Sequence, residues 1–146
     1  MIVIDASAVI ELLLASESGI EIVHRIRDGE ETLHAPHLLD LEVVQVLRRS
    51  ERAGLVDASR ALEALGDLGV LGIVRHDHEG LLDRVWELRE NLTAYDAAYV
   101  ALAEALDAPL LTRDAKIAAA PGHRARVELV SRPGTRAPGP RPAPSA

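Results

Sequence analysis

The stretch MIVIDASAVIELL, residues 1–13, decides the fold. Residues 1–5 form a short apolar run that ends in an aspartate, which is typical of a buried strand. Residues 8–15 continue as an apolar helix, and Asp5 or Ser7 is the candidate N-cap of that helix. A buried strand that leads directly into a helix is the opening unit of an α/β fold.

The same alternation continues along the chain. The predicted strands cover residues 32–35, 71–75, 110–112 and 127–130. The predicted helices cover residues 18–29, 37–53, 57–68, 79–91, 93–107 and 114–120. Short apolar strands separated by helices indicate a parallel sheet with helices on both faces.

Helical periodicity predicts which side chains face the core. The helix at 37–53 has apolar residues at i, i+4, i+7 and i+8, the spacing of one buried stripe. In the helix at 18–29 we expect Ile20, Val23 and Ile26 to share a face. In the helix at 93–107 we expect a common face for Tyr95, Tyr99, Leu102 and Leu106.

Composition and charge divide the chain into two parts. The 146 residues carry a net charge of −7 and include 48% hydrophobic residues, enough for one well-packed domain. Residues 132–146 are rich in Pro, Gly and Ala and contain arginines but no acid, so we expect a disordered tail there. The expected domain covers residues 1–131, and it holds all of the acidic excess.

Several classes of protein are excluded or disfavoured. The absence of cysteine excludes disulfides, thiolate metal sites and a cysteine nucleophile. No apolar run reaches the ~20 residues of a membrane span, and the N-terminus lacks a basic leader, so a cytoplasmic protein without membrane contact is expected. An acidic body disfavours diffuse binding to nucleic acid, but it is compatible with a nuclease whose acids surround a divalent metal.

Four acids occupy positions that suggest such a site. Asp5 and Asp114 follow predicted strands, and ligands of parallel sheets bind outside the carboxyl ends of the strands. Glu42 and Asp96 interrupt apolar helical stretches. Two carboxylates ~4 Å apart repel by about 4 kcal/mol at an effective dielectric of 20, so a shared pocket would need a cation. Mg²⁺ and Mn²⁺ prefer oxygen ligands.

Spacing alone leaves a simpler role open for each acid. Asp5 and Asp114 also suit a helix cap or a turn. Glu42 also suits the border of an ordinary helix, and Asp96 is favoured in a first turn by the helix dipole. Asp77, which follows the strand at 71–75, is a further strand-end acid.

Four motifs carry a family resemblance. The segments VIDASAVIELL (3–13), LEVVQVLRR (41–49), TAYDAAYVALAEAL (93–106) and LLTRDAK (110–116) resemble the PIN-domain ribonucleases, and within them the VapC toxins of bacterial VapBC toxin–antitoxin pairs. The resemblance implies a three-layer α/β/α domain over residues 1–131. It also implies an endoribonuclease that depends on Mg²⁺ or Mn²⁺, and a toxin role.

The resemblance also assigns residues. It implies that Asp5, Asp96 and Asp114 hold the metal and that Glu42 orients the metal or its water. Small polar residues that flank such a pocket match Ser7 and Thr112. Many relatives carry Asn three residues after the helical Glu, where this chain has Gln45. The implied partners are RNA, a VapB-type antitoxin and a second copy of the chain in a homodimer.

Further residues are candidates for contact with RNA. Basic side chains near the motifs are Arg48, Arg49, Arg113 and Lys116. Tyr95 and Tyr99 suit base stacking as well as core packing. Trp86 suits the core or a subunit interface.

Other function classes stay open at this point. A PIN-like domain that has lost catalysis would be a binding module. Aspartate-dependent phosphatases and receiver domains also carry an acid after the first strand, but the phosphatases use D-x-D, and here Asp5-Ala6-Ser7 lacks the second acid. The pairs His34-x-x-His37 and His76-x-His78 suggest zinc only weakly, because neither has a clear third ligand.

Overall fold

The computed structural model describes residues 1–28 and 31–130. The predicted tail at 132–146 lies outside these residues. In the described part of the chain, no helix is long and apolar enough to span a bilayer. The described residues all fall within the domain predicted for residues 1–131, and the boundary of that domain stays a prediction.

The sheet is built around β1 (Ile2–Ile4), whose side chains are fully buried. Within the described residues, five strands pair in parallel in the order β3-β2-β1-β4-β5. The other strands are β2 (Leu33–Pro36), β3 (Val74–His76), β4 (Leu110–Thr112) and β5 (Val127–Leu129). A strand covered on both faces is apolar throughout, which explains the unbroken run that opens the sequence.

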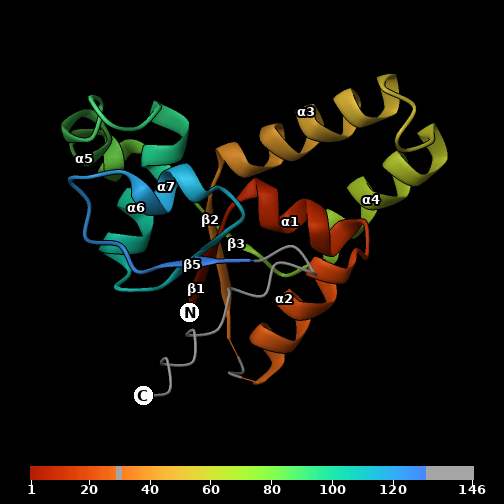
Figure 1. The fold of residues 1–146 in the computed structure, drawn as a ribbon, viewed down its shortest axis with the longest axis horizontal. Coiled ribbons are helices and arrows are strands. Elements are labelled where there is room, and N and C mark those ends of the chain that lie inside the picture. Colours follow the sequence, from red (N-terminus) through yellow and green to blue (C-terminus); the bar gives the residue numbers. More distant parts are fainter. Residues whose placement is uncertain (29–30, 131–146) are drawn as a thin grey trace, which may run out of the picture.

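Helices cover both faces of the sheet, as predicted (Figure 1). The helices are α1 (Ala6–Leu13), α2 (Glu17–Asp28), α3 (Leu38–Arg52), α4 (Ala58–Val70), α5 (Leu82–Glu87), α6 (Ala94–Ala105) and α7 (Ala115–Ala119), with a 3₁₀ helix, η1, at Glu79–Leu81. Helices α1 to α4 lie on one side, and α5 and α6 lie on the other. The predicted three-layer α/β/α architecture is confirmed.

Several helices of the described chain begin at a side chain that accepts a backbone N–H. Asp5, Asp57, Thr93 and Asp114 cap α1, α4, α6 and α7 respectively. Each cap satisfies one of the backbone donors that the first turn of a helix leaves unpaired. Two of these caps, Asp5 and Asp114, are also acids of the predicted site.

The strand order reverses between β1 and β4. Strands β1, β2 and β3 run outward to one side of the sheet in chain order, and β4 and β5 lie on the other side. The backbone N–H of Asp5 donates to the carbonyl of Leu111, 3.2 Å away, so the ends of these two strands are adjacent. This reversal is the place where open parallel sheets bind ligands.

Three local predictions were wrong. Strand β3 begins at Val74 rather than residue 71, and the helix predicted at 79–91 is shorter and split between η1 and α5. In α2, Ile22 is buried, while Ile20 and Val23 are exposed. The face of α2 that contacts α1 includes Gly19, whose small size allows a close approach to the backbone of Glu11.

Candidate active site at the carboxyl ends of β1 and β4

Asp5 is the most enclosed acid of the candidate site, with 6% of its surface exposed. Its Oδ1 accepts from the Ser7 hydroxyl at 2.7 Å and from the backbone N–H of Ala8 at 3.0 Å. Its Oδ2 accepts from the Thr112 hydroxyl at 2.5 Å. Burial raises the pKa of the Asp5 carboxyl, the three hydrogen bonds oppose that rise, and the nearby charge of Asp114 adds to it.

Thr112 and Ser7 link the two central strands at the site. The Thr112 hydroxyl also accepts from the backbone N–H of Asp114 at 2.9 Å. The Ser7 hydroxyl accepts from the backbone N–H of Arg113 at 2.9 Å. Each hydroxyl therefore donates to Asp5 and accepts from the loop after β4, so the loop that carries Asp114 is fixed against Asp5.

Glu42 reaches the site from α3 and is half-buried. Its Oε2 accepts a hydrogen bond of 2.6 Å from the hydroxyl of Tyr99, which lies on α6. Burial raises the pKa of the Glu42 carboxyl, and the hydrogen bond from Tyr99 lowers it. The negative charges of Asp5 and Asp96 raise the pKa of Glu42 further, so both carboxylates lie within electrostatic range of it.

Asp96 lies in the first turn of α6 and is partly exposed. Its Oδ2 accepts from the Thr93 hydroxyl at 2.9 Å, and the same hydroxyl accepts from the backbone N–H of Asp96 at 3.2 Å. This reciprocal cap fixes the carboxylate at the start of the helix. The four predicted acids thus come from two strand ends and two helices, and the fold brings them to one edge of the sheet.

The donor set suits a hard divalent cation. All four acids offer carboxylate oxygens, the ligand type that Mg²⁺ and Mn²⁺ prefer. Burial and neighbouring negative charges raise the pKa of Asp5 and of Glu42, and a bound cation would offset both effects. In the described residues, no three His, Asp or Glu side chains form a ready metal-binding group as they stand. Mg²⁺ needs no such cage, because it retains several waters and takes one or two carboxylates.

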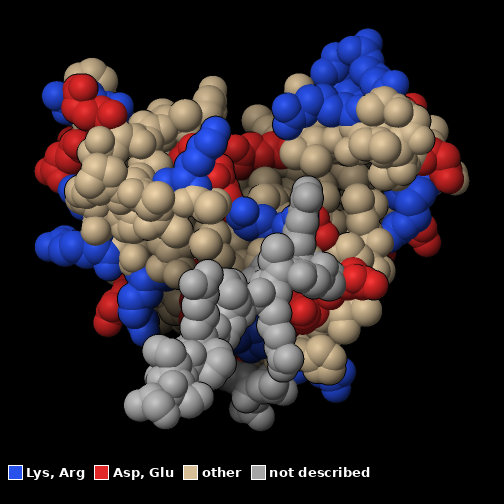
Figure 2. Space-filling view, viewed as in Figure 1, with Lys and Arg blue, Asp and Glu red and all other residues tan. Residues whose placement is uncertain are grey.

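Glu42 opens into a cavity of about 570 Å³ between α3 and the start of α6. The residues that line it are Ala6, Leu38, Leu41, Glu42, Gln45, Val46, Arg49 and Tyr95. Figure 2 shows acidic surface in the notch beside α3 and basic surface gathered over the C-terminal half of α3. The prediction that Tyr95 and Tyr99 share a buried face was wrong, because Tyr99 is 2% exposed and Tyr95 is 64% exposed.

The basic side chains predicted to contact RNA differ in the partners that they already have. The guanidinium of Arg113 forms an ion pair with Glu11. Arg48 donates to the side chain of Gln45 at 3.3 Å. Lys116 is exposed at the start of α7, beside Asp114.

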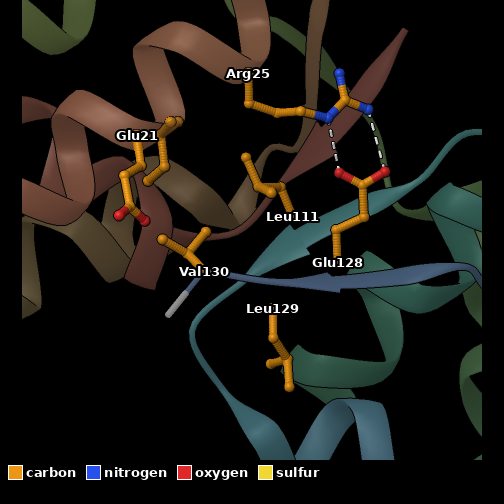
Figure 3. A pocket seen from close by; sticks show the side chains of 7 residues that line it. Glu21, Arg25, Leu111, Glu128, Leu129 and Val130 are labelled. Carbon is orange, nitrogen blue, oxygen red and sulfur yellow. Dashed lines mark hydrogen bonds and ion pairs between the residues drawn. The ribbon is translucent and has the colours of Figure 1, made fainter. Parts of the chain in front are cut away.

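A separate cavity of about 210 Å³ lies between α2 and the edge strand β5 (Figure 3). Arg25 and Glu128 form a bidentate ion pair at its rim, with nitrogen–oxygen distances of 2.9 and 3.1 Å. None of the four acids lines this cavity. It has no part in the candidate site.

The histidine pairs hold neighbouring strands together. His34 contacts the hydroxyl of Thr32 at 3.0 Å and the ring of His76 at 2.9 Å, which joins β2 to β3. His78 accepts from the backbone N–H of Leu38 at 3.2 Å. Burial lowers the pKa of His34. Asp77 is exposed and accepts from the backbone N–H of Glu79, apart from the four acids.

Trp86 is 67% exposed on α5, where the guanidinium of Arg89 lies 4.7 Å from its ring centre. The prediction that Trp86 packs in the core was wrong. Its alternative position, in a subunit interface, stays a prediction.

Comparisons with known proteins agree with the fold and the motifs. The sequence profile of the PIN domain matches residues 2–122. Ribonuclease VapC1 of Mycobacterium tuberculosis strain H37Rv is 45% identical over 129 residues, which cover 88% of this chain and 96% of that protein.

Two solved structures have the same fold. The crystal structure of PAE2754 from Pyrobaculum aerophilum has a TM-score of 0.65 at 27% identity, covering 86% of this chain and 81% of that one. VapBC2 from Rickettsia felis, solved with a DNA fragment from its promoter, has a TM-score of 0.67 at 15% identity, covering 90% of this chain and all of that one. With a profile match over most of its length and a ribonuclease relative at this identity, the chain belongs to the PIN-domain family, in the group of the VapC ribonucleases.

Proposed function

We propose that this chain is a divalent-metal-dependent endoribonuclease that acts as the toxin of a VapBC-type toxin–antitoxin pair. The observation that carries the proposal is the electrostatic coupling of the acids near the ends of β1 and β4, in a chain of the VapC group: the charge of Asp114 acts on Asp5, and the charges of Asp5 and Asp96 act on Glu42. The relatives support the activity through their name, ribonuclease. We assign Mg²⁺ as the metal, with Mn²⁺ as a substitute, from the all-oxygen donor set.

The four acids and the two hydroxyls have different roles in this proposal. Asp5, Asp96 and Asp114 would hold the cation, and Glu42 would orient it or the attacking water. A bound Mg²⁺ or Mn²⁺ would supply a nucleophilic water and neutralise charge on the phosphate in the transition state. Ser7 and Thr112 hold the Asp5 carboxylate in one rotamer by donating to its two oxygens. The water would attack an RNA phosphodiester in line, and the ester bond opposite it would break, so that one ribose oxygen leaves as a hydroxyl.

Charge outside the acids supports a path for RNA. Lys116, Arg48 and Arg49 are exposed and would contact phosphates. Arg113 would contribute only after it leaves Glu11. Solved relatives include a toxin–antitoxin complex from Klebsiella pneumoniae, which supports a VapB-type antitoxin as the partner of this chain. We also assign a homodimer and a cytoplasmic location.

Cleavage of RNA by the purified protein tests the proposal. Protein freed of antitoxin is incubated with total cellular RNA, with Mg²⁺, with Mn²⁺ or with EDTA, beside the variant Asp96→Asn. Discrete fragments that require both the metal and Asp96 are expected. Asparagine keeps the acceptor that Thr93 uses, so the thermal melt of the variant should be nearly unchanged. Full activity in Asp96→Asn, or in EDTA, would overturn the assignment.

The main alternative is a PIN-like module that binds its partner without catalysis. The ribonuclease and the binding module differ in metal binding, which calorimetric titration with Mn²⁺ measures directly. A folded protein that neither cleaves RNA nor binds Mn²⁺ would favour the module.

A further inference from the structure

The cavity beside Glu42 has two chemically different ends. Glu42 and Arg49 both line it, and they lie seven residues apart on α3. Seven residues are almost two helical turns, so the two side chains share one face about 10 Å apart along the helix axis. An acid of the candidate site therefore stands at one end, and a cation stands at the other.

Arg49 is available to an external anion. Six other arginines pair with carboxylates in the described part of the chain: Arg25, Arg60, Arg75, Arg84, Arg89 and Arg113. Arg49 is exposed, and within the same residues it has no ion-pair partner. A cation that lines a cavity without a counter-ion is a site for a phosphate oxygen.

Tyr95 forms the facing wall from the first turn of α6. Its ring is 64% exposed, although the following residues of the helix, from Ala97 to Ala103, are buried. Leu38, Leu41 and Val46 supply apolar surface beside it. A flat aromatic ring, apolar surface and one free cation match a nucleotide, since the ring stacks on the base and the cation pairs with the phosphate.

We propose that this cavity binds the nucleotide next to the scissile phosphate, with its base stacked on Tyr95 and its phosphate paired with Arg49. The proposal rests on the proposed ribonuclease activity, because Glu42 places the reacting phosphate at the other end of the same cavity. The nucleotide must be unpaired, since a base within a duplex has its faces covered by its neighbours. The antitoxin, or a second copy of the chain, is the competing occupant.

Substitutions at Tyr95 and Arg49 test the proposal with matched controls. The substrate is a 12-nucleotide single-stranded RNA that spans a cut made by the wild type in total RNA. Tyr95→Ala is expected to raise KM roughly 5- to 150-fold, the range of one lost base stack. Tyr95→Phe keeps the ring and should restore the binding that Tyr95→Ala loses. Trp86→Ala removes an equally exposed aromatic ring outside the cavity and should leave KM unchanged.

Salt dependence isolates the contribution of Arg49. Arg49→Ala should weaken binding and reduce the slope of log affinity against log salt by about 0.7, the share of one phosphate on a single strand. Arg52→Ala removes an exposed arginine from the same helix that does not line the cavity, and its slope should match the wild type. Equal slopes for Arg49→Ala and the wild type would overturn the phosphate contact.

A binding assay separates this proposal from the proposed function. Fluorescence anisotropy of a labelled 12-nucleotide adenosine RNA is measured on the Asp114→Asn background, in which asparagine preserves the cap of α7. Weaker binding by Tyr95→Ala supports the subsite even if the wild type cuts no RNA, an outcome in which only the nuclease assignment fails. Unchanged binding and unchanged KM overturn the subsite while cleavage stands. A change in oligomeric state with Tyr95→Ala, measured by light scattering, assigns the cavity to a protein interface instead.

Discussion

The hydroxyl of Tyr99 donates a hydrogen bond of 2.6 Å to Oε2 of Glu42 and so ties α6 to α3 across the site. This bond leaves Oε1 and one lone pair of Oε2 for a cation or a water. Both helices carry an acid of the site, and this bond sets the position of one relative to the other.

Removal of this hydrogen bond should reduce the affinity for the metal more than it reduces the stability of the fold. Tyr99→Phe frees the Glu42 carboxylate and removes a donor that lowers its pKa, so that pKa should rise. We expect a roughly tenfold higher Mn²⁺ requirement for cleavage, which equals about 1.4 kcal/mol, the size of one hydrogen bond. Mn²⁺ affinity by calorimetry and the thermal melt give the two readouts. An unchanged Mn²⁺ affinity would contradict this role of Tyr99.

Asp5→Asn should make the metal-free protein more stable at pH 7. Burial raises the pKa of Asp5, so in the folded state the carboxyl holds its proton to higher pH than in the unfolded chain. The free energy of unfolding should therefore increase as pH falls from neutrality towards the pKa that Asp5 has in the unfolded chain. It should decrease as pH rises. Asparagine removes the buried charge and keeps the N-cap.

Thermal melts in EDTA from pH 5 to pH 8 measure this effect. The stability of the wild type relative to Asp5→Asn should increase towards pH 5. Added Mg²⁺ should raise the melting temperature of the wild type and not that of the variant, since ligand binding to the folded state stabilises it. A variant that melts below the wild type in EDTA at pH 7 would show that the hydrogen bonds of Asp5 outweigh its desolvation.

Thr112→Val should cost stability as well as activity. Valine has nearly the shape of threonine but leaves Oδ2 of Asp5 without its donor and the N–H of Asp114 without its acceptor. Thr112 is fully buried, so each unpaired group carries a desolvation penalty, and we expect a loss of about 1–3 kcal/mol. Urea unfolding measures it. Ser59→Ala, which removes an exposed hydroxyl bonded to Asp57 at 2.8 Å, should cost far less.

Two glycine substitutions should change the free energy of unfolding in opposite directions. A Cβ at Gly19 would lie 2.2 Å from the carbonyl oxygen of Glu11, so Gly19→Ala must push α1 and α2 apart at a cost of about 1–3 kcal/mol. Gly66 lies within α4 with nothing within 4 Å of an added Cβ, so Gly66→Ala should stabilise by about 0.5–1 kcal/mol. Paired urea titrations compare them. A gain in stability from Gly19→Ala would contradict the tight helix contact.

The sequence predicted elements better where local signals agreed. The run at 1–5 became β1, and Thr93 caps α6 as its position before an apolar helix indicates. In α6 almost every residue after Asp96 is apolar, so periodicity had little contrast with which to distinguish Tyr95 from Tyr99. Their different burial follows from the position of α3. Glu42 of α3 accepts a hydrogen bond from the Tyr99 hydroxyl, whereas Tyr95 lies at the wall of the cavity.

Errors occurred where tertiary packing overrides a local pattern. In α2, the pattern of Ile20 and Val23 suggested the buried face, but Gly19 lies against α1 and Ile22 is the buried residue. For the site, the sequence supplied the four acids and their order. It could not show that Tyr99 holds Glu42 or that Arg49 shares a cavity with it, since these relationships depend on how helices cross in space.

The hydrogen bond between Thr112 and Asp5 joins residues that lie 107 positions apart. During synthesis, a chain that already carries Asp5, Glu42 and Asp96 still lacks β4 and its acid. The carboxylate site is therefore completed late in translation, and a product truncated before residue 110 would have three of the four acids without the strand that fixes them. The order of the strands delays assembly of the site until most of the domain has been made.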